Sequence, residues 1–547
     1  MYASPMRRFL TAVALSVGAA MLPSAAHAAS CGDINGNTQV QINDVTILLR
    51  SVNGLENDAA LCGGMGIVQC GDINASGGKD IGDVVGLLRS VSNIETLFPI
   101  CVGPGPNLAG CPGVATLPSS ITSNLTVPAG CECRIDGTTF IEPGVVLTFA
   151  AGAVCKGLKG SATPSVLVFK PDSKIDARGT AGSPVVFTSD QAPGTRTKGD
   201  WGGLVILGRA PINVPGGTDS IEGLPPSPDF VFGGNEANDS SGVVRFTRVE
   251  FSGRELSLDN ELNLFVTGGV GRGTTLDHIQ GHNGLDDCIE WFGGTVNAKF
   301  LVASACGDDG FDTQLGVAGA VQYGLIAQEV NTVEAGGSLG WESDNNENGF
   351  DLQPRTSHRY CNVTALGVKG QGEPAATNQV GMLPRRGSAI TVANAIIKGF
   401  REAGVQIRDA ATAARACVNS TTLATSAPVL GLQNAILYDN GPGAPGTTHF
   451  LNHSSCDAPG DGCSCTTTEW GALLQASKNV LTGTDPGVGG GVFPPTNLVP
   501  GIGSIADTHP AVNCSTIDPF FEPAQYIGGF EPGGVDWTAG WTAYPLN

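Results

Sequence analysis

The stretch Asn283–Asp312 has the sequence NGLDDCIEWFGGTVNAKFLVASACGDDGFD. It contains an internal repeat: Asp286-Asp287 returns as Asp308-Asp309, and Ile289-Glu290 returns as Phe311-Asp312, both after 22 residues. A repeat of this length is typical of stacked architectures. The apolar runs inside it are short and interrupted by Gly and Asn, so they indicate β-strands. We therefore expect successive coils of a parallel β-solenoid.

A third copy of the pattern is expected farther along, because residues 310–314 (GFDTQ) resemble residues 349–353 (GFDLQ). Neighbouring side chains of a strand point to opposite faces, so one residue of each pair faces the interior and the next faces outward. The interior residues are predicted to be Ile289, Phe311 and Phe350. The outward residues are predicted to form a column of carboxylates from Glu290, Asp312 and Asp351.

The amino-acid composition excludes several classes of protein. The chain has 547 residues, of which 79 are Gly without a Gly-X-Y period, so collagen is excluded. Such Gly content suits a chain that turns sharply several times per coil. The formal net charge is -21, which argues against nucleic acid and against anionic membrane surfaces as partners. Acidic, oxygen-rich surfaces instead attract hard cations such as calcium.

The N-terminus has the features of a secretory signal over residues 1–28. Arg7-Arg8 is followed by the apolar run Phe9–Leu22 and by the small-residue site Ala26-His27-Ala28. The apolar run is too short for a membrane anchor, and no later stretch is long enough to span a bilayer. We expect a bacterial-type protein that is secreted or held at the cell surface; Cys31 leaves lipidation as an alternative.

The chain has sixteen cysteines, all after the signal. An even number in an exported protein favours disulfides. Two groups resemble zinc ligands, namely Cys131 with Cys133, and Cys456 with Cys463 and Cys465. Their spacings lack the usual two-residue gaps of zinc sites, so disulfides are the favoured interpretation.

Residues 31–101 contain a duplication with an offset of 39 residues, seen in CGDIN at 31–35 and again at 70–74. Each copy is a polar loop followed by an amphipathic pattern typical of a helix. The loops carry oxygen ligands at EF-hand spacing, as calcium requires. The predicted ligands of the first loop are Asp33, Asn35, Asn37, Gln39 and Asp44. Those of the second loop are Asp72, Asn74, Ser76, Gly78, Asp80 and Asp83. Turns and helix caps are the alternative use of such residues.

This duplicated segment resembles the type I dockerin family. The resemblance implies a small all-α, EF-hand-like module over residues 29–104 that folds around calcium and docks to a cohesin-like module or another cell-surface partner. The segment departs from the dockerin pattern in two places: Thr38 stands where Gly is usual, and Ile42-Asn43 replaces the Ser-Thr pair that recognises the partner. Disulfides Cys31–Cys62 and Cys70–Cys101 are one of three possible pairings.

Residues 112–440 contain short alternating apolar runs, such as Val145-Leu147-Phe149, separated by Gly- and Pro-containing turns. Their style and spacing resemble the right-handed parallel β-helices of the pectin-lyase-like superfamily. The predicted fold is therefore mainly β, with a small α module in front. Residues 441–547 are rich in Gly and Pro, and we expect them to cap the open end of the solenoid, since repeat proteins need a cap.

The superfamily resemblance implies a sugar groove on the outer face of stacked strands. Clustered carboxylates suit acid–base chemistry or cation binding. The candidate catalytic residues are Asp286, Asp287, Asp308, Asp309, Glu290, Asp312 and Asp351, with Arg272, Arg355 and His282 as possible partners. The signature Asp-Asp, Gly-His-Gly and Arg-Ile-Lys order of the hydrolases is not found in the sequence.

Three functions are compatible with these patterns. The favoured one is a secreted calcium-binding β-helix protein that engages polysaccharide or the cell surface. The second is a polysaccharide lyase or glycoside hydrolase. The third is a structural or adhesive surface protein in which Asp and Asn only form turns, because a fold alone does not establish function.

Overall fold

The computed structural model describes residues 42–53, 84 and 108–547, apart from 109, 112, 162, 226, 258–259, 335–336, 373–377, 418–428 and 457–461. The chain divides into two units, Met1–Gly105 and Pro106–Asn547. Among the helices that the structure describes, none combines the length and the hydropathy of a membrane-spanning segment.

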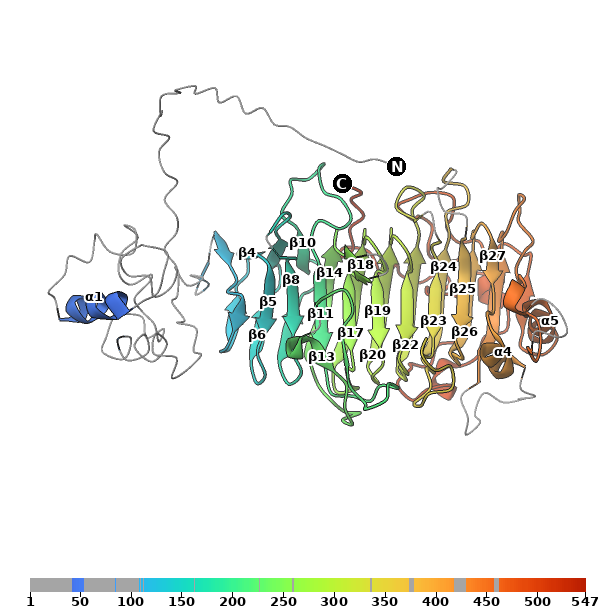
Figure 1. Cartoon of the computed structure of the whole chain (residues 1–547). Helices are drawn as coiled ribbons and strands as arrows, with labels where there is room; N and C mark the ends of the chain where they lie inside the picture. Colours follow the sequence, from blue (N-terminus) through green and yellow to red (C-terminus); the bar gives the residue numbers. More distant parts are fainter. Residues whose placement is uncertain are drawn as a thin grey trace, which may run out of the picture. The chain divides into compact units, whose positions relative to one another are not determined.

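The first unit contains helix α1 (Ile42–Val52; Figure 1). Val45, Leu48 and Ser51 are buried on one side of it, as the helical spacing of the sequence predicts. Asp44 lies in the first turn of α1 and is also buried. The other predicted calcium ligands lie outside the described residues: Asp33, Asn35, Asn37, Gln39, Asp72, Asn74, Ser76, Gly78, Asp80 and Asp83. The EF-hand-like module therefore stays a prediction.

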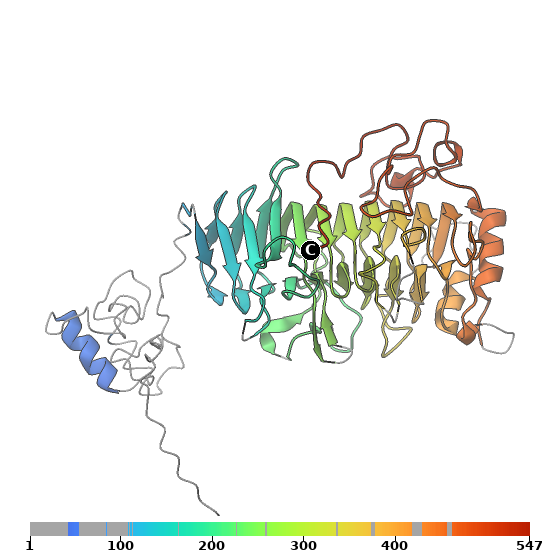
Figure 2. The same cartoon turned by 90° about the horizontal axis from the view of Figure 1, so that it is seen from above.

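The second unit is a parallel β-helix (Figures 1 and 2). One of its walls is a ten-stranded sheet in which each strand pairs in parallel with the next. Its strands, in order, are β2 (Ser120–Ile121), β5 (Thr138–Ile141), β8 (Val166–Phe169), β11 (Gly203–Leu207), β17 (Phe265–Gly268), β19 (Ile289–Phe292), β21 (Phe311–Gln314), β23 (Trp341–Asp344), β25 (Val380–Arg385) and β27 (Ala403–Val405).

The second wall is a fifteen-stranded sheet with two branches that join at β14 (Gly242–Glu250). One branch is β3 (Leu125–Val127), β6 (Val146–Phe149) and β9 (Lys174–Arg178); the other is β1 (Val114–Thr116), β4 (Glu132–Ile135), β7 (Val154–Gly157) and β10 (Val185–Ser189). The long strands that follow are β18 (Thr275–His282), β20 (Asn297–Ser304), β22 (Ala320–Ala327), β24 (Arg359–Leu366), β26 (Thr391–Lys398) and β28 (Gly431–Tyr438), with β29 (Val480–Thr482) last.

The long strands bend at one equivalent position in each coil. Phe246, His278, Phe300 and Tyr323 have positive φ there, a conformation that L-residues rarely adopt. Their rings stack face to face, with successive centroids 4.1, 4.2 and 4.6 Å apart. Stacking of this kind offsets part of the backbone strain, so the corner is repeated from coil to coil.

The remaining elements form insertions and the C-terminal end. Two short hairpins are β12 (Asp219–Ser220) with β13 (Val231–Phe232), and β15 (Arg254–Ser257) with β16 (Asn260–Leu262). The α-helices are α4 (Ala410–Ala416), α5 (Thr467–Ser477) and α6 (Ile505–Thr508), and the 3-10 turns are η3 (Pro228–Phe230), η4 (Ser454–Cys456) and η5 (Cys514–Thr516).

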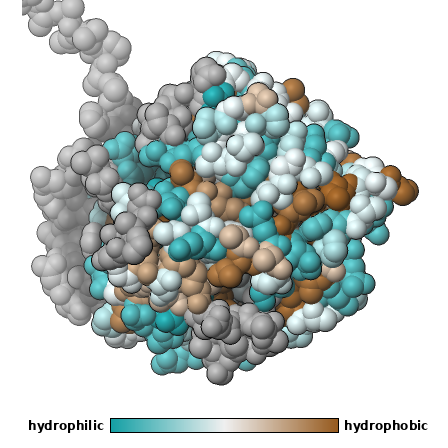
Figure 3. Space-filling model, turned by 90° about the vertical axis from the view of Figure 1, so that its right-hand side faces the viewer, coloured by the Kyte–Doolittle hydropathy of each residue, from teal (hydrophilic) through white to brown (hydrophobic). Residues whose placement is uncertain are grey.

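Residues 441–547 were expected to cap the end of the solenoid. One part of this segment lies at that end, and another part runs along the side. Trp470 and Leu474 of α5 join the interior core cluster at the last coils, and Figure 3, which views this end, shows small hydrophobic areas separated by hydrophilic ones. The segment after β29 instead turns back along the side of the β-helix (Figure 2). There Ile527, Phe530 and Trp541 cover apolar residues on the outer face of the fifteen-stranded sheet.

Six disulfides form among the described cysteines: Cys111–Cys131, Cys133–Cys155, Cys288–Cys306, Cys361–Cys514, Cys417–Cys465 and Cys456–Cys463. The preference for disulfides over zinc at residues 131, 133, 456, 463 and 465 is confirmed. Cys31, Cys62, Cys70 and Cys101 lie outside the described residues. Disulfides in this number indicate an extracytoplasmic location.

Candidate functional site

Three carboxylates form a column on the outer face of the ten-stranded sheet. The register pairs Glu290 of β19 with Asp312 of β21, and Asp312 with Glu342 of β23. Ile289, Phe311 and Trp341 precede them and point into the core, where all three are fully buried. The inward and outward directions predicted for β19 and β21 are therefore confirmed, but Glu290 and Asp312 are buried (1% and 8% exposed) rather than facing solvent.

The prediction that Phe350 and Asp351 continue this pattern in a third coil is wrong. Phe350 is 37% exposed rather than interior, and the Asp351 side chain is 81% exposed and forms an ion pair with Arg355 at 2.7 Å. Both residues lie in the turn after β23. The GFD similarity is local, whereas the stacking of coils follows backbone pairing. The usable signal was the order Gly, aromatic, acid, hydroxyl, which is shared by residues 310–313 (GFDT) and 340–343 (GWES).

Four aspartates lie in the turns that lead into β19 and β21. Asp287 and Asp309 belong to a ladder in which each side-chain Oδ1 accepts a backbone N–H from the next coil. Asn263 accepts from Asp287 N at 3.0 Å, Asp287 from Asp309 N at 2.9 Å, and Asp309 from Leu339 N at 2.9 Å. These aspartates therefore have a structural role in the turns, whatever else they do.

The turn aspartates and the column also converge. Carboxylate oxygens lie within 4.8 Å of one another in three overlapping groups. The groups are Asp286, Asp287 and Asp308; Asp287, Glu290 and Asp312; and Asp309, Asp312 and Glu342. Shared members link all seven side chains into one acidic cluster. It contains every candidate catalytic residue predicted from sequence except Asp351, and adds Glu342.

Burial and mutual repulsion raise the pKa of these carboxyl groups. Burial, followed by the charge of Asp344, raises the pKa of Asp312 to about 6. Burial, followed by the charge of Glu334, raises the pKa of Asp308 to about 7. The pKa values of Asp287, Asp309 and Glu290 are also raised well above their usual range, and burial is again the largest cause. The cluster resists full ionisation unless a cation is present.

The cationic partners lie at one end of the cluster. Arg385 of β25 forms ion pairs with Glu342 and with Asp344, the latter at 2.8 Å, and Arg386 lies 2.6 Å from Asp344. At the other end, Glu290 accepts hydrogen bonds from two amides, Gln314 Nε2 at 2.8 Å and Asn263 Nδ2. Sequence reasoning missed Arg385, because its distance from the acidic repeat hides the pairing.

Two of the three predicted partner residues have other contacts, and the third is exposed. His282 is buried on β18, where it is bonded to Pro545 O (2.7 Å) and Ser304 Oγ (3.0 Å), and burial lowers its pKa. Arg355 donates to the carbonyls of Phe350 and Gly387 as well as to Asp351. Arg272 is exposed in the turn before β18.

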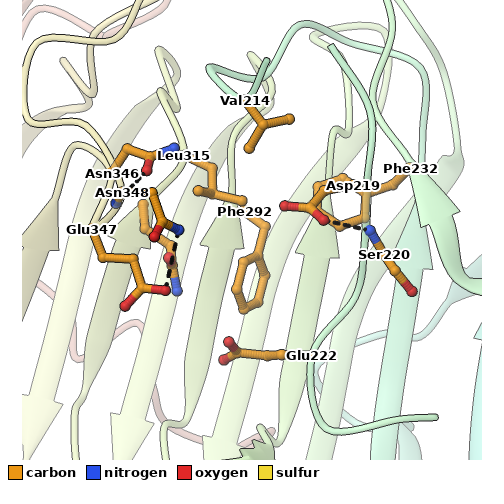
Figure 4. Close-up of a pocket in the computed structure, with 11 residues that line it drawn as sticks. Val214, Asp219, Ser220, Glu222, Phe232, Phe292, Leu315, Asn346, Glu347 and Asn348 are labelled. Atoms are coloured by element: carbon orange, nitrogen blue, oxygen red, sulfur yellow. Dashed lines mark hydrogen bonds between the residues drawn. The ribbon is translucent and has the colours of Figure 1, made fainter. Parts of the chain in front are cut away.

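A cavity of about 100 Å³ adjoins the acidic cluster (Figure 4). Phe292 of β19 and Gln314 of β21 belong to the same outer face as the acidic column. The insertion between β11 and β14 and the turn after β23 supply the other walls. The lining residues are Val214, Asp219, Ser220, Glu222, Phe232, Phe292, Gln314, Leu315, Asn346, Glu347 and Asn348.

Two solved structures show weak similarity to the chain. The periplasmic alginate epimerase AlgG is 10% identical with a TM-score of 0.25, and the match covers 60% of this chain and 72% of the epimerase. Full-length tailspike protein 2 of the Escherichia coli O157:H7 bacteriophage CAB120 is 11% identical with a TM-score of 0.20, covering 56% of this chain and 38% of the tailspike. No curated protein matches the chain.

A family model gives a stronger result. The pectate-lyase-like β-helix domain matches residues 119–475. The matched segment begins beside β2, ends within α5, and contains the whole acidic cluster. Since it spans more than half of the sequence, the chain belongs to the family of pectate-lyase-like β-helix domains.

Proposed function

We propose that this protein is an extracytoplasmic β-helix protein that binds calcium in the acidic cluster and engages polysaccharide, or a cell surface made of it, on that face. The observation that carries the proposal is the convergence of seven carboxylates on the turns and strands of three successive coils. Membership in the pectate-lyase-like family makes the outer strand face the natural place for a glycan.

Calcium suits the donor set. The cluster offers only oxygen ligands, and calcium takes six to eight oxygens in flexible geometry. In the described part of the chain, no Lys or Arg forms an ion pair with Asp286, Asp287, Glu290, Asp308, Asp309 or Asp312. A divalent cation would supply the missing positive charge. Three groups of residues could hold it, namely Asp286, Asp287 and Asp308; Asp287, Glu290 and Asp312; or Asp309, Asp312 and Glu342.

Glycan binding would use the same surface. The cluster is buried apart from the partly exposed Asp286 and Asp308. A sugar hydroxyl or carboxylate oxygen would therefore reach a calcium ion from that side or from the adjoining cavity. The front unit belongs to the proposal as a dockerin-like docking module. Its support is the duplicated loop pattern, together with the buried Asp44 at the start of α1.

Catalysis is a second candidate, favoured by one specific observation. The pKa of Asp312, raised to about 6, suits proton transfer near neutral pH. Asp312 also lies beside Glu290 on the neighbouring strand, and paired carboxylates are the usual machinery of glycoside hydrolases. In a lyase, bound calcium would stabilise negative charge on a uronate while a nearby group removes the proton.

Calcium titration of the full chain tests the proposal. The substitutions Asp33→Ala and Asp72→Ala first remove the predicted sites of the front unit, so that remaining calcium uptake belongs to the β-helix. Glu290→Gln and Asp312→Asn should then abolish or strongly weaken this uptake. Asp351→Asn, which removes an exposed carboxylate, should leave it unchanged. Uptake that is insensitive to Glu290→Gln and Asp312→Asn would refute a calcium site here.

Polymer assays separate binding from catalysis. The full chain would be incubated with pectin, alginate and neutral glycans, with calcium or with a chelator. Calcium-dependent retention without new unsaturated or reducing ends supports the binding function. Release of such ends that disappears in Asp312→Asn supports an enzyme instead. Absence of both retention and release would leave the structural or adhesive function.

A further inference from the structure

The cavity beside the acidic cluster is lined by acidic, apolar and neutral polar side chains. None of these side chains belongs to the cluster. Figure 4 shows Phe292 at its centre, with the carboxylates of Asp219, Glu222 and Glu347 on different sides. All three acidic residues are exposed to solvent. At roughly 10–15 Å³ per water position, about 100 Å³ accommodates a compact group of several heavy atoms, on the order of one sugar ring.

The charge of the lining is one-sided. It contains three acidic residues and no Lys, Arg or His. Arg386 lies 3.8 Å from Glu347, but it is already paired with Asp344 at 2.6 Å. Shielding from water by the cavity walls, followed by the charge of Asp312 in the neighbouring acidic cluster, raises the pKa of Glu222 to about 7. A cation in the cavity would therefore favour the ionised form of Glu222. A bare uronate carboxylate would be repelled from this cavity, and a positively charged group would be attracted.

The arrangement suits an organic cation better than a metal ion. Among the described residues, the groups whose oxygens converge within 4.8 Å lie in the acidic cluster and include none of Asp219, Glu222 and Glu347. Carboxylates that surround a space without converging do not provide the short coordination distances that calcium needs. They can instead accept charge-assisted hydrogen bonds from an ammonium group.

The apolar part of the lining suits a carbon skeleton. Phe292 and Phe232 lie with ring centroids 6.2 Å apart in an edge-on arrangement, and Val214 and Leu315 complete this side. Aromatic faces stack on the C–H-rich faces of rings and attract cations. Gln314, Asn346, Asn348 and Ser220 supply neutral donors and acceptors suited to hydroxyl groups.

A buried amide network holds the walls together. Asn213 Nδ2, from the insertion, donates to Asn345 Oδ1 at 2.9 Å, and Asn346 Nδ2 donates to Asn213 Oδ1 at 3.0 Å. These residues are 132 and 133 positions apart in sequence, and all three are buried. Satisfied buried networks of this kind rigidify a site, so the cavity is preformed.

We infer that this cavity is a subsite for one amine-bearing sugar residue of the glycan, with the ammonium group among Asp219, Glu222 and Glu347 and the ring against Phe292. The inference rests on the proposed function and deepens it, because it names the sugar class that the face selects. The calcium-bearing column and this subsite lie side by side on one sheet face. A polymer containing both acidic and amino sugars would therefore contact both.

The test compares glucosamine oligosaccharides with N-acetylglucosamine oligosaccharides of equal length, titrated into the full chain at neutral pH. Acetylation removes the positive charge and keeps the ring. We expect the amine form to bind about tenfold more tightly, since charge-assisted bonds are about twice as strong as neutral ones. Glu222→Gln should remove most of this preference, and Phe292→Ala should weaken both ligands.

Glu531→Gln is the matched control, because Glu531 is an exposed glutamate in the C-terminal segment; it should leave the preference intact. Equal affinity for the two oligosaccharides, or no binding of either, overturns the inference. Binding of a ringless polyamine as tight as that of the glucosamine oligosaccharide also overturns it, because the sugar ring would then contribute nothing. Calcium uptake and retention on uronate polymers are read separately, so the proposed function can survive this failure.

Discussion

Glu290 and Asp312 are 22 residues apart in sequence and lie directly opposite each other on the parallel strands β19 and β21. Neighbouring strands are about 4.8 Å apart, and both side chains are buried. Two buried carboxylates at this separation repel each other when both are ionised. The energetics of this face are therefore coupled to protons and cations.

The first prediction concerns stability against pH in the presence of a chelator. The folded-state pKa values of Asp312 and Asp308, about 6 and about 7, exceed the ordinary carboxyl value. The folded protein then binds protons that the unfolded chain releases, so stability decreases as pH rises from about 4 to about 7. Thermal unfolding in chelator should occur at a lower temperature at pH 8 than at pH 5.

Calcium should reverse this loss at pH 8 and have little effect at pH 5, because the ion binds ionised carboxylates. At a calcium concentration 100-fold above the dissociation constant, the gain is about 2.7 kcal/mol. The control is the same pair of scans on Asp312→Asn, in which both effects should shrink. Equal unfolding temperatures at the two pH values in chelator would contradict the prediction.

The second prediction separates the two roles of Asp287. Asp287→Asn keeps the Oδ1 that accepts from Asp309 N and removes a carboxyl group whose ionised form is disfavoured by burial, as its raised pKa shows. In chelator at neutral pH the free energy of unfolding should therefore rise by about 1 kcal/mol. Asp287→Ala leaves the buried amide of Asp309 unpaired and should lower it by about 1–3 kcal/mol. Denaturant titration measures both changes. Equal losses of stability in Asp287→Asn and Asp287→Ala would show that the acidity of Asp287 does not destabilise the fold.

The third prediction concerns the C-terminal segment along the side of the β-helix. Trp541 is fully buried against the fifteen-stranded sheet, so Trp541→Ala should cost about 3–5 kcal/mol. Val535 belongs to the same segment and is 83% exposed; Val535→Ala should change stability by less than about 0.5 kcal/mol. Similar values for the two variants in denaturant titration would show that the segment does not pack as described.

The fourth prediction concerns the amide network behind the cavity. Asn213→Ala leaves the side chains of Asn345 and Asn346 without this partner and should lower stability by about 1–3 kcal/mol. It should also weaken any ligand of the cavity, because the insertion would no longer be held over β19. Asn238→Ala, an exposed position in the same insertion, is the control for both measurements. Unchanged ligand affinity in Asn213→Ala would show that Asn213 does not position the walls of the cavity.

The local sequence pattern was sufficient to predict the β-strands, the parallel solenoid, and the inward and outward faces of β19 and β21. The alternation at Ile289-Glu290 and Phe311-Asp312 depends only on neighbouring residues, and a regular offset of 22 residues reports one coil length. The same reasoning failed at Phe350-Asp351, because the coil between β21 and β23 is longer: Asp312 pairs with Glu342, an offset of 30 residues.

The sequence by itself therefore determined the architecture and the acidic character of one face, since strand alternation and repeat offsets are local properties of the chain. Only the tertiary structure decided which acids meet, that Glu342 and Arg385 complete their column, and that an insertion joined through Asn213 encloses a cavity beside it. The physical reason is that backbone hydrogen bonding between coils sets the register. Coil lengths of unequal size then bring together side chains that have no fixed spacing in sequence.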